Sequence, residues 1–168
     1  MIDTINNIRV IKSLSEIAND DKNTVAAVGN FDGVHLGHRK IIEHAKTIAD
    51  RVGARPSVLT FEPHPRALFQ TDGVPFRLST SLSKARALSE TGIDLIFELQ
   101  FDQKFAQLSA EEFVVKVLKN SLQLNHVVCG YDFVFGHRRR GTAEILETLG
   151  SQVGIGCLYT HLTLPTNR

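Results

Sequence analysis

The sequence predicts an α/β protein with a mainly parallel sheet and helices on both of its faces. Along the 168 residues, short apolar runs alternate regularly with stretches of helical periodicity. Repeated strand–helix pairs are typical of βαβ units, in which successive strands lie parallel. No internal repeat or low-complexity segment interrupts the alternation, so the main body is expected to be a single domain.

Five apolar runs indicate the strands of this sheet. The run at 24–29, TVAAVG, is short and β-branched and ends in glycine, which is typical of a buried strand. The run at 56–62, PSVLTFE, also indicates a buried strand and stops at the proline-rich EPHPR. The expected strands are 8–14, 24–29, 56–62, 94–101 and 126–130.

Helical stretches connect these runs. Apolar residues recur at helical spacing from 36 to 52. Ser109 followed by Glu112 forms a capping-box pattern, which places a helix from there to about Leu122. The other expected helices are a short polar stretch after the first strand, a segment that begins at a cap on Ser79 or Ser81 and runs through Leu88 towards Gly92, and 141–150.

Three segments of unusual composition follow expected strands, at 29–38, 62–77 and 130–141. In an open parallel sheet, ligands bind beyond the carboxyl ends of the strands, where such loops emerge. We therefore expect these three segments to converge on one crevice.

Composition excludes several classes of protein. An apolar fraction of 42% and a charged fraction of 22% are ordinary for a globular chain, and the formal net charge of +1 marks no affinity for nucleic acid or for an anionic membrane. No run approaches the roughly 20 apolar residues of a membrane span, and the N-terminus does not resemble a secretory signal. Two cysteines make no disulfide framework. A cytoplasmic location is therefore expected.

The stretch AVGNFDGVHLGHRKIIEHAK, at 27–46, carries the densest group of unusual residues. Glycines and two histidines, His35 and His38, stand between an expected strand and the start of an expected helix. A helix N-terminus favours an anion, and glycines let the backbone approach a phosphate closely. The spacing matches neither the Walker A loop nor G-x-G-x-x-G. The two imidazoles could donate to phosphate oxygens in a transition state, which suits a phosphoryl-type transfer.

Three motifs in order carry a family resemblance: GNFDGVHLGH, TFEPHPRALF at 60–69 and CGYDFVFGHRRRG at 129–141. The first resembles the H-x-G-H motif of the nucleotidylyl transferase superfamily. In its G-x-F-D-G-x-H-x-G-H form it is similar to the FMN adenylyltransferase domain of bacterial bifunctional riboflavin kinase/FAD synthetases. The stretch FDQKFAQLSAEEFVVKVL is also similar to that family.

This resemblance implies a Rossmann-like nucleotidylyl transferase fold and the transfer of AMP from ATP to FMN, with Mg²⁺ accompanying ATP. It implies that His35 and His38 are catalytic. On the resemblance, the ATP-binding residues are Gly29, Asn30, Phe31, Asp32, Gly33, His35, Gly37 and His38. The flavin-binding residues are Pro63, His64, Arg66, Asp132, Phe133, Phe135 and Gly136, and one of Arg138, Arg139 and Arg140 would meet phosphate.

Other interpretations of these residues remain open. His35 and His38 could instead share a metal ion with His64 and Cys129, although the segment offers no clear third ligand, and we expect no protein-bound metal. Asp32 could be a turn residue rather than a contact for Mg²⁺. Two other functions compete: another H-x-G-H nucleotidylyl transferase, and a flavin- or nucleotide-binding module without catalysis.

The end of the chain departs from the family pattern. From Gly156 onward, GCLYTHLTLPTNR has neither helical periodicity nor the basic Ser/Thr-rich segment that the family uses to bind nucleotide phosphates. We expect an adenylyltransferase domain over 1–156, incomplete at its C-terminus, and a non-native tail over 157–168. A riboflavin kinase domain is expected in the full-length protein.

Overall fold

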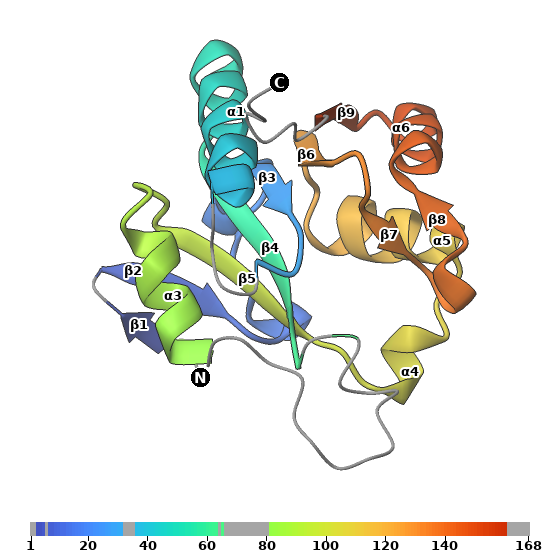
Figure 1. Cartoon of the computed structure of the whole chain (residues 1–168), viewed down its shortest axis with the longest axis horizontal. Coiled ribbons are helices and arrows are strands. Elements are labelled where there is room, and N and C mark those ends of the chain that lie inside the picture. Colours follow the sequence, from blue (N-terminus) through green and yellow to red (C-terminus); the bar gives the residue numbers. More distant parts are fainter. Residues whose placement is uncertain (1–2, 6, 32–35, 64, 66–80, 161–168) are drawn as a thin grey trace, which may run out of the picture.

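A computed structural model describes residues 3–5, 7–31, 36–63, 65 and 81–160. Within this part of the chain, seven strands form one sheet in the order β1-β2-β5-β4-β3-β6-β9 (Figure 1). Every neighbouring pair is parallel except the hairpin of β1 with β2. The strands are β1 (Asp3–Ile5), β2 (Ile8–Ile11), β3 (Val25–Val28), β4 (Pro56–Glu62), β5 (Leu95–Gln100), β6 (His126–Gly130) and β9 (Gly156–Thr160).

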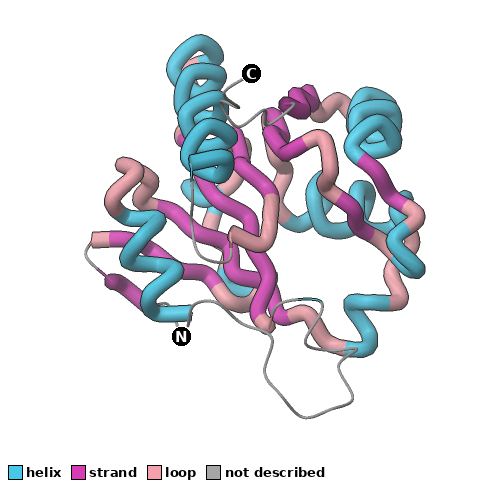
Figure 2. The backbone as a smooth tube through the Cα atoms, viewed as in Figure 1, coloured by secondary structure: helices cyan, strands magenta, loops and turns pink. Residues whose placement is uncertain are grey.

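Helices cover both faces of the sheet, as the alternation of the sequence predicts (Figure 2). One apolar cluster packs α1 (Leu36–Val52) and α3 (Ser81–Ser89) against one set of strand side chains, such as Val25 and Ala27. The alternate side chains, such as Ala26 and Val28, join a second cluster on the opposite face. That cluster contains residues of the π-helix η3 (Phe113–Ser121) and of α6 (Ala143–Gln152).

The mainly parallel α/β fold is confirmed, and several boundaries agree closely. The helix expected at 36–52 and the strand expected at 56–62 have those bounds as α1 and β4. The first strand is shorter than expected and pairs with β1, a strand that the sequence analysis did not anticipate. The polar stretch after it forms two short 3₁₀ turns, Leu14–Glu16 and Asn19–Asp21.

The helix expected at 109–122 is present, but most of it is wound as a π-helix. The capping box forms around α5 (Ala110–Glu112): Glu112 N donates to Ser109 Oγ at 3.0 Å, and Ser109 N donates to Glu112 Oε1 at 3.1 Å. The chain then continues as η3, in which Leu122 N donates to Val117 O, five residues back. Capping residues fix where a helix begins, whereas this wider winding depends on how the segment packs.

The helix expected at 141–150 begins two residues later, at Ala143, as α6 (Ala143–Gln152). Gly141–Thr142 form β8, which pairs antiparallel with β7 (Val134–Phe135), and α6 starts after Thr142, whose Oγ1 accepts from Ile145 N. Strand β9 lies beside β6. The domain end expected at 156 remains a prediction, and residues 161–168 lie outside the described part of the chain.

The order of strands places the candidate loops. From β3 the chain passes through α1 to β4 on one side, while β6 lies on the other side of β3. The sheet therefore changes winding direction between β3 and β6, and such a switch point is where open α/β sheets bind ligands. The described residues that follow β3 and β6 leave the sheet there (Figure 1).

The opposite, amino-end edge of the sheet is held by polar pairs. Asp21, just before β3, accepts two hydrogen bonds from Arg9 at 2.9 and 2.8 Å and one from Ala18 N–H. Burial alone would raise the pKa of Asp21, but these hydrogen bonds outweigh it and lower the pKa below its ordinary value. Arg55 and Asp94 form another pair on this edge.

Candidate active site

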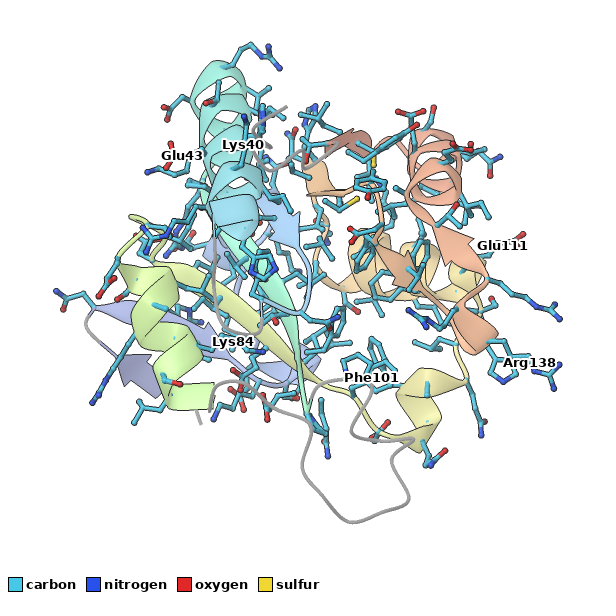
Figure 3. The ribbon with its side chains drawn as sticks, viewed as in Figure 1. Lys40, Glu43, Lys84, Phe101, Glu111 and Arg138 are labelled. Carbon is cyan, nitrogen blue, oxygen red and sulfur yellow. The ribbon has the colours of Figure 1, made fainter. Side chains whose placement is uncertain are left out.

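A cavity of about 750 Å³ opens at the carboxyl ends of the central strands. Segments that follow β3, β4, β5 and β6 all contribute to its walls, so the expected convergence occurs for the residues that the structure describes. Figure 3 labels two of the lining residues, Phe101 after β5 and Arg138 after β7. The other segments contribute Asn30, Pro65, residues from α4 (Gln103–Ala106) to Leu108, and the rest of 134–139.

Phenylalanines form the apolar wall of this cavity. Phe61, Phe101 and Phe105 contact one another with ring centroids 5.6 to 6.3 Å apart. Phe113 continues the group to Phe135 at 5.3 Å. Aromatic groups at these separations pack favourably and offer flat apolar surfaces. This wall suits a planar aromatic ligand.

Two glycines shape the wall around Phe135. Gly136 has φ of 78°, and a Cβ there would lie 2.9 Å from Ala110 N, so both its conformation and its surroundings exclude a side chain. His137 N donates to Leu108 O at 2.7 Å, which joins this wall to the segment before α5. A Cβ on Gly141 would stand 2.6 Å from a Phe135 ring carbon. Glycine at 141 therefore leaves the space that the Phe135 ring occupies.

A basic rim closes one side of the cavity. His137, Arg138 and Arg139 line it, whereas Arg140 does not. Arg138 and Arg139 both have φ of 57°, a left-handed conformation that is uncommon for residues other than glycine. Guanidinium groups bind phosphate through several donors at once. The rim can therefore accept a phosphate from a ligand that lies against the phenylalanines.

The loop after β3 begins at Gly29, and its first residues are hydrogen-bonded to β4. Gly29 N donates to Leu59 O at 3.1 Å, and Thr60 Oγ1 donates to Asn30 O at 2.9 Å. Asn30 lines the cavity, and within the described chain its buried Oδ1 has no hydrogen-bond partner. This segment therefore adjoins the aromatic cavity directly.

Phe31 links this loop to the first turn of α1. It is fully buried with φ of 50°, and its ring meets the His38 imidazole edge to face, with centroids 5.1 Å apart. A Cβ on Gly29 would already touch the Phe31 ring at 3.4 Å. His38 is half-buried near the N-terminus of α1, where backbone N–H groups favour an anion.

Only some of the remaining expected site residues line the cavity. Gly37 lies in the first turn of α1, and Pro63 follows β4 through a cis peptide bond. Phe135 and Gly136 line the cavity, Phe133 stacks on Phe135 without lining it, and Asp132 is exposed outside it. Asp32, Gly33, His35, His64 and Arg66 lie outside the described residues.

Four phenylalanines of the wall were not predicted as site residues from the sequence. Phe61 belongs to β4, Phe101 and Phe105 flank the start of α4, and Phe113 begins η3. A usable signal was present, because FDQKF, at 101–105, repeats phenylalanine four residues apart where an expected strand ends. Only the fold shows that Phe61 and Phe113 meet this pair.

The described side chains provide no group of three His, Cys, Asp or Glu residues close enough to hold a metal ion. Cys129, considered as a metal ligand, is buried, and its hydrogen bond with Cys157 together with burial raises the pKa of its thiol. A protonated buried thiol is a poor ligand and packs as a small apolar side chain. Nor is any described helix both long enough and apolar enough for a membrane span.

A model of the family described as FAD synthetase matches residues 17–164, which is most of the chain. The chain belongs to the FAD synthetase family. The bifunctional riboflavin kinase/FMN adenylyltransferase of Escherichia coli K12 is 36% identical over 153 residues, covering 91% of this chain and 48% of the relative. The protein of the same name from Buchnera aphidicola of Acyrthosiphon pisum is 34% identical, covering 85% and 46%. The chain thus spans about half the length of these relatives.

A solved structure shares the fold. A crystal structure described as a macrolide-efflux protein from Streptococcus pneumoniae superimposes with a TM-score of 0.75 at 25% sequence identity. The match covers 89% of this chain and 49% of that one. The α/β architecture described above is therefore also found in an experimental structure.

Proposed function

We propose that this domain is an FMN adenylyltransferase, which transfers AMP from ATP to FMN to give FAD and pyrophosphate. The observation that carries the proposal is the junction of two features at one edge of the sheet: the Gly29–Phe31 segment with His38, and the phenylalanine cavity with its basic rim. Family membership and the names of the relatives support the same reaction.

The flavin would lie in the cavity. Its planar ring system would stack against the group around Phe61, Phe101 and Phe105, and its phosphate would reach towards Arg138 and Arg139. The sequence alone does not distinguish the three arginines at 138–140, and the cavity lining favours Arg138 and Arg139 over Arg140. Asp132 lies outside this cavity and has no proposed contact with the ring system.

ATP would bind over the loop after β3. Gly29, Asn30 and Phe31 would shape its site, with Asp32, Gly33, His35 and Gly37 assigned on the family motif alone. An FMN phosphate oxygen would attack the α-phosphorus of ATP in line as pyrophosphate leaves. His38 would donate a hydrogen bond to the phosphate oxygens as negative charge develops, and its edge-to-face contact with Phe31 would hold the ring in place.

Mg²⁺ would neutralise the leaving pyrophosphate when it is bound. The described carboxylates form no three-ligand set, which fits an ion held mainly by the phosphates of ATP rather than by a protein cage. We further infer a cytoplasmic location, where ATP is available, and a riboflavin kinase domain in the full-length protein, as in the relatives' names.

Two measurements test the proposal. Flavin fluorescence should be quenched when FMN or FAD is titrated with the protein, and absence of quenching at high protein concentration would remove the flavin assignment. Radioactive pyrophosphate exchange with FMN should then separate an enzyme from a binding module, since binding without exchange means a module.

The same exchange assay tests His38. Replacing His38 with alanine should lower turnover by roughly 10²–10³-fold, the scale of losing one donor to a transition state. Flavin quenching should persist, because His38 does not line the cavity. Near-normal turnover of the variant would contradict the role of His38.

A further inference from the structure

A buried lysine stands beside the site without lining its cavity. Lys84, on α3, is 4% exposed, and its Nζ donates to Thr60 Oγ1 at 3.3 Å and to Phe61 O at 3.4 Å. Its ammonium also forms an ion pair with Glu62 at 3.9 Å. Burying a cation is unfavourable unless hydrogen bonds and an opposite charge compensate it, and Lys84 has both. Figure 3 labels this residue between α3 and the sheet.

Thr60 passes the interaction on to the loop after β3. A lysine ammonium can only donate, so Thr60 Oγ1 accepts from Lys84 and its own proton is directed to Asn30 O, 2.9 Å away. Thr60 is fully buried, and its register partner on β5, Glu98, is 4% exposed. The chain of donors therefore runs in one direction, from Lys84 through Thr60 to the backbone of Asn30.

Lys84 is thereby connected to the two segments that are proposed to bind substrates. Asn30 lines the aromatic cavity and precedes Phe31, whose ring contacts His38. Glu62 ends β4 and directly precedes Pro63. A single side chain thus contacts the segment assigned to flavin and, through one hydroxyl, the segment assigned to ATP.

We propose that Lys84 and Thr60 are positioning residues for adenylyl transfer: they fix the backbone at Asn30, and with it the Phe31–His38 contact, relative to the segment after β4. Neither side chain touches a reacting atom. The expected effect on catalysis rests on the proposed function. The fixing of the backbone at Asn30 does not, because it depends only on contacts within this chain.

Removing one hydroxyl tests the role with little change of shape. In pyrophosphate exchange with FMN and ATP, Thr60→Val should lower kcat between about 10- and 100-fold, as expected when reacting groups are held about 1 Å out of place. Thr60→Ser keeps the hydroxyl and should retain kcat within a few-fold of the starting protein. Equal kcat for these two variants would overturn the proposal.

A matched control lies at the other end of the sheet. Thr24 is also buried, and its Oγ1 lies 2.9 Å from Ser57 Oγ, so Thr24→Val removes a buried hydroxyl that is far from the cavity. It should lower the melting temperature about as much as Thr60→Val while leaving kcat unchanged. An equal loss of kcat in both valine variants would mean a general loss of folding rather than positioning.

Hydrogen exchange separates failure of this inference from failure of the proposed function. Amides of the Asn30–Phe31 segment should exchange faster in Thr60→Val than in Thr60→Ser, whether or not the protein forms FAD. Lys84→Met should produce the same faster exchange if it folds, and adding Thr60→Val to it should change little more, because both residues act through one chain. Unchanged exchange in Thr60→Val would overturn the positioning role even in an active enzyme.

Discussion

The two edges of the sheet are built in opposite ways from the same strands. At the amino ends, polar side chains pair with one another over short distances: Arg9 with Asp21, Arg55 with Asp94, and Asn23 with Asn125. A polar cavity of about 530 Å³ lies at this edge, lined by groups such as Asn120 and Gln123.

At the carboxyl ends, the chain instead exposes phenylalanines and arginines to a larger cavity. Many of the supporting contacts there involve backbone atoms and glycines, as between Gly136 and Ala110 or between Thr60 and Asn30. The side-chain ion pair of Lys84 with Glu62 supports the end of β4. At the first edge, polar side chains therefore pair with one another and stabilise the fold. At the second, the arginines of the rim face a cavity whose walls are supported largely by backbone contacts.

The sharpest way to break this contrast is to truncate the phenylalanine wall. Phe105→Ala should weaken FMN binding by about 2–3 kcal/mol, which is roughly 30- to 150-fold, because a large part of the apolar surface offered to the flavin is lost. Fluorescence quenching measures the affinity. Leu149→Ala, which removes a core-packing side chain outside the cavity, should destabilise the fold but leave FMN affinity within about 2-fold. Equal weakening by both would contradict the flavin pocket.

Two glycine substitutions separate a steric clash in the cavity wall from backbone strain elsewhere. Gly141→Ala should lower the free energy of unfolding by about 2 kcal/mol and also weaken FMN binding, because the new Cβ displaces the Phe135 ring. Gly53→Ala is the control: its φ of 71° strains a side chain, but no atom lies within 4 Å. It should cost about 1 kcal/mol in urea unfolding with unchanged FMN affinity.

The amino-end edge should respond to pH. The pKa of Asp21 is lowered in the folded chain, so its carboxylate stabilises the fold above its ordinary pKa of 3.8, and this stabilisation is lost as pH falls through the lower folded value. Asp21→Asn should cost about 1.5–2 kcal/mol at pH 7 and progressively less below pH 4. Urea unfolding at several pH values measures this, and a gap that does not depend on pH would contradict the charge pairing.

The smallest expected effect concerns the helix start beside the cavity wall. Ser109→Ala removes the acceptor for Glu112 N and should cost about 1 kcal/mol of stability. FMN affinity should fall by less than a factor of two, because the His137–Leu108 backbone bond remains. A large loss of affinity would show that the cap, rather than that bond, holds this wall.

Much of the fold could be predicted because local patterns and tertiary structure agree. The apolar spacing of α1 and the compact run of β4 gave their bounds, and Ser109 with Glu112 gave the start of a helix. A contiguous motif predicted Asn30, Phe135 and Gly136 as site residues, and all three line the cavity, although Asn30 was assigned to ATP rather than to the flavin. Their contacts with a substrate remain predictions.

The rest depends on contacts between distant segments. Phe61 and Phe113 are far apart in the chain, and only the order of the strands brings their rings 6.3 Å apart. The π-helical winding of Phe113–Ser121 leaves its apolar spacing close to that of an α-helix. A buried lysine such as Lys84 resembles any other helical lysine until its partners on β4 are known.

The backbone bond from His137 to Leu108, together with the close approach of Gly136 to Ala110, has an evolutionary consequence. These contacts hold one wall of the cavity through main-chain atoms, which substitutions do not alter directly. Homologous proteins can therefore exchange the residues that touch a substrate, and so change in affinity, while this wall keeps its position. Moving this wall would require an insertion or a replaced glycine.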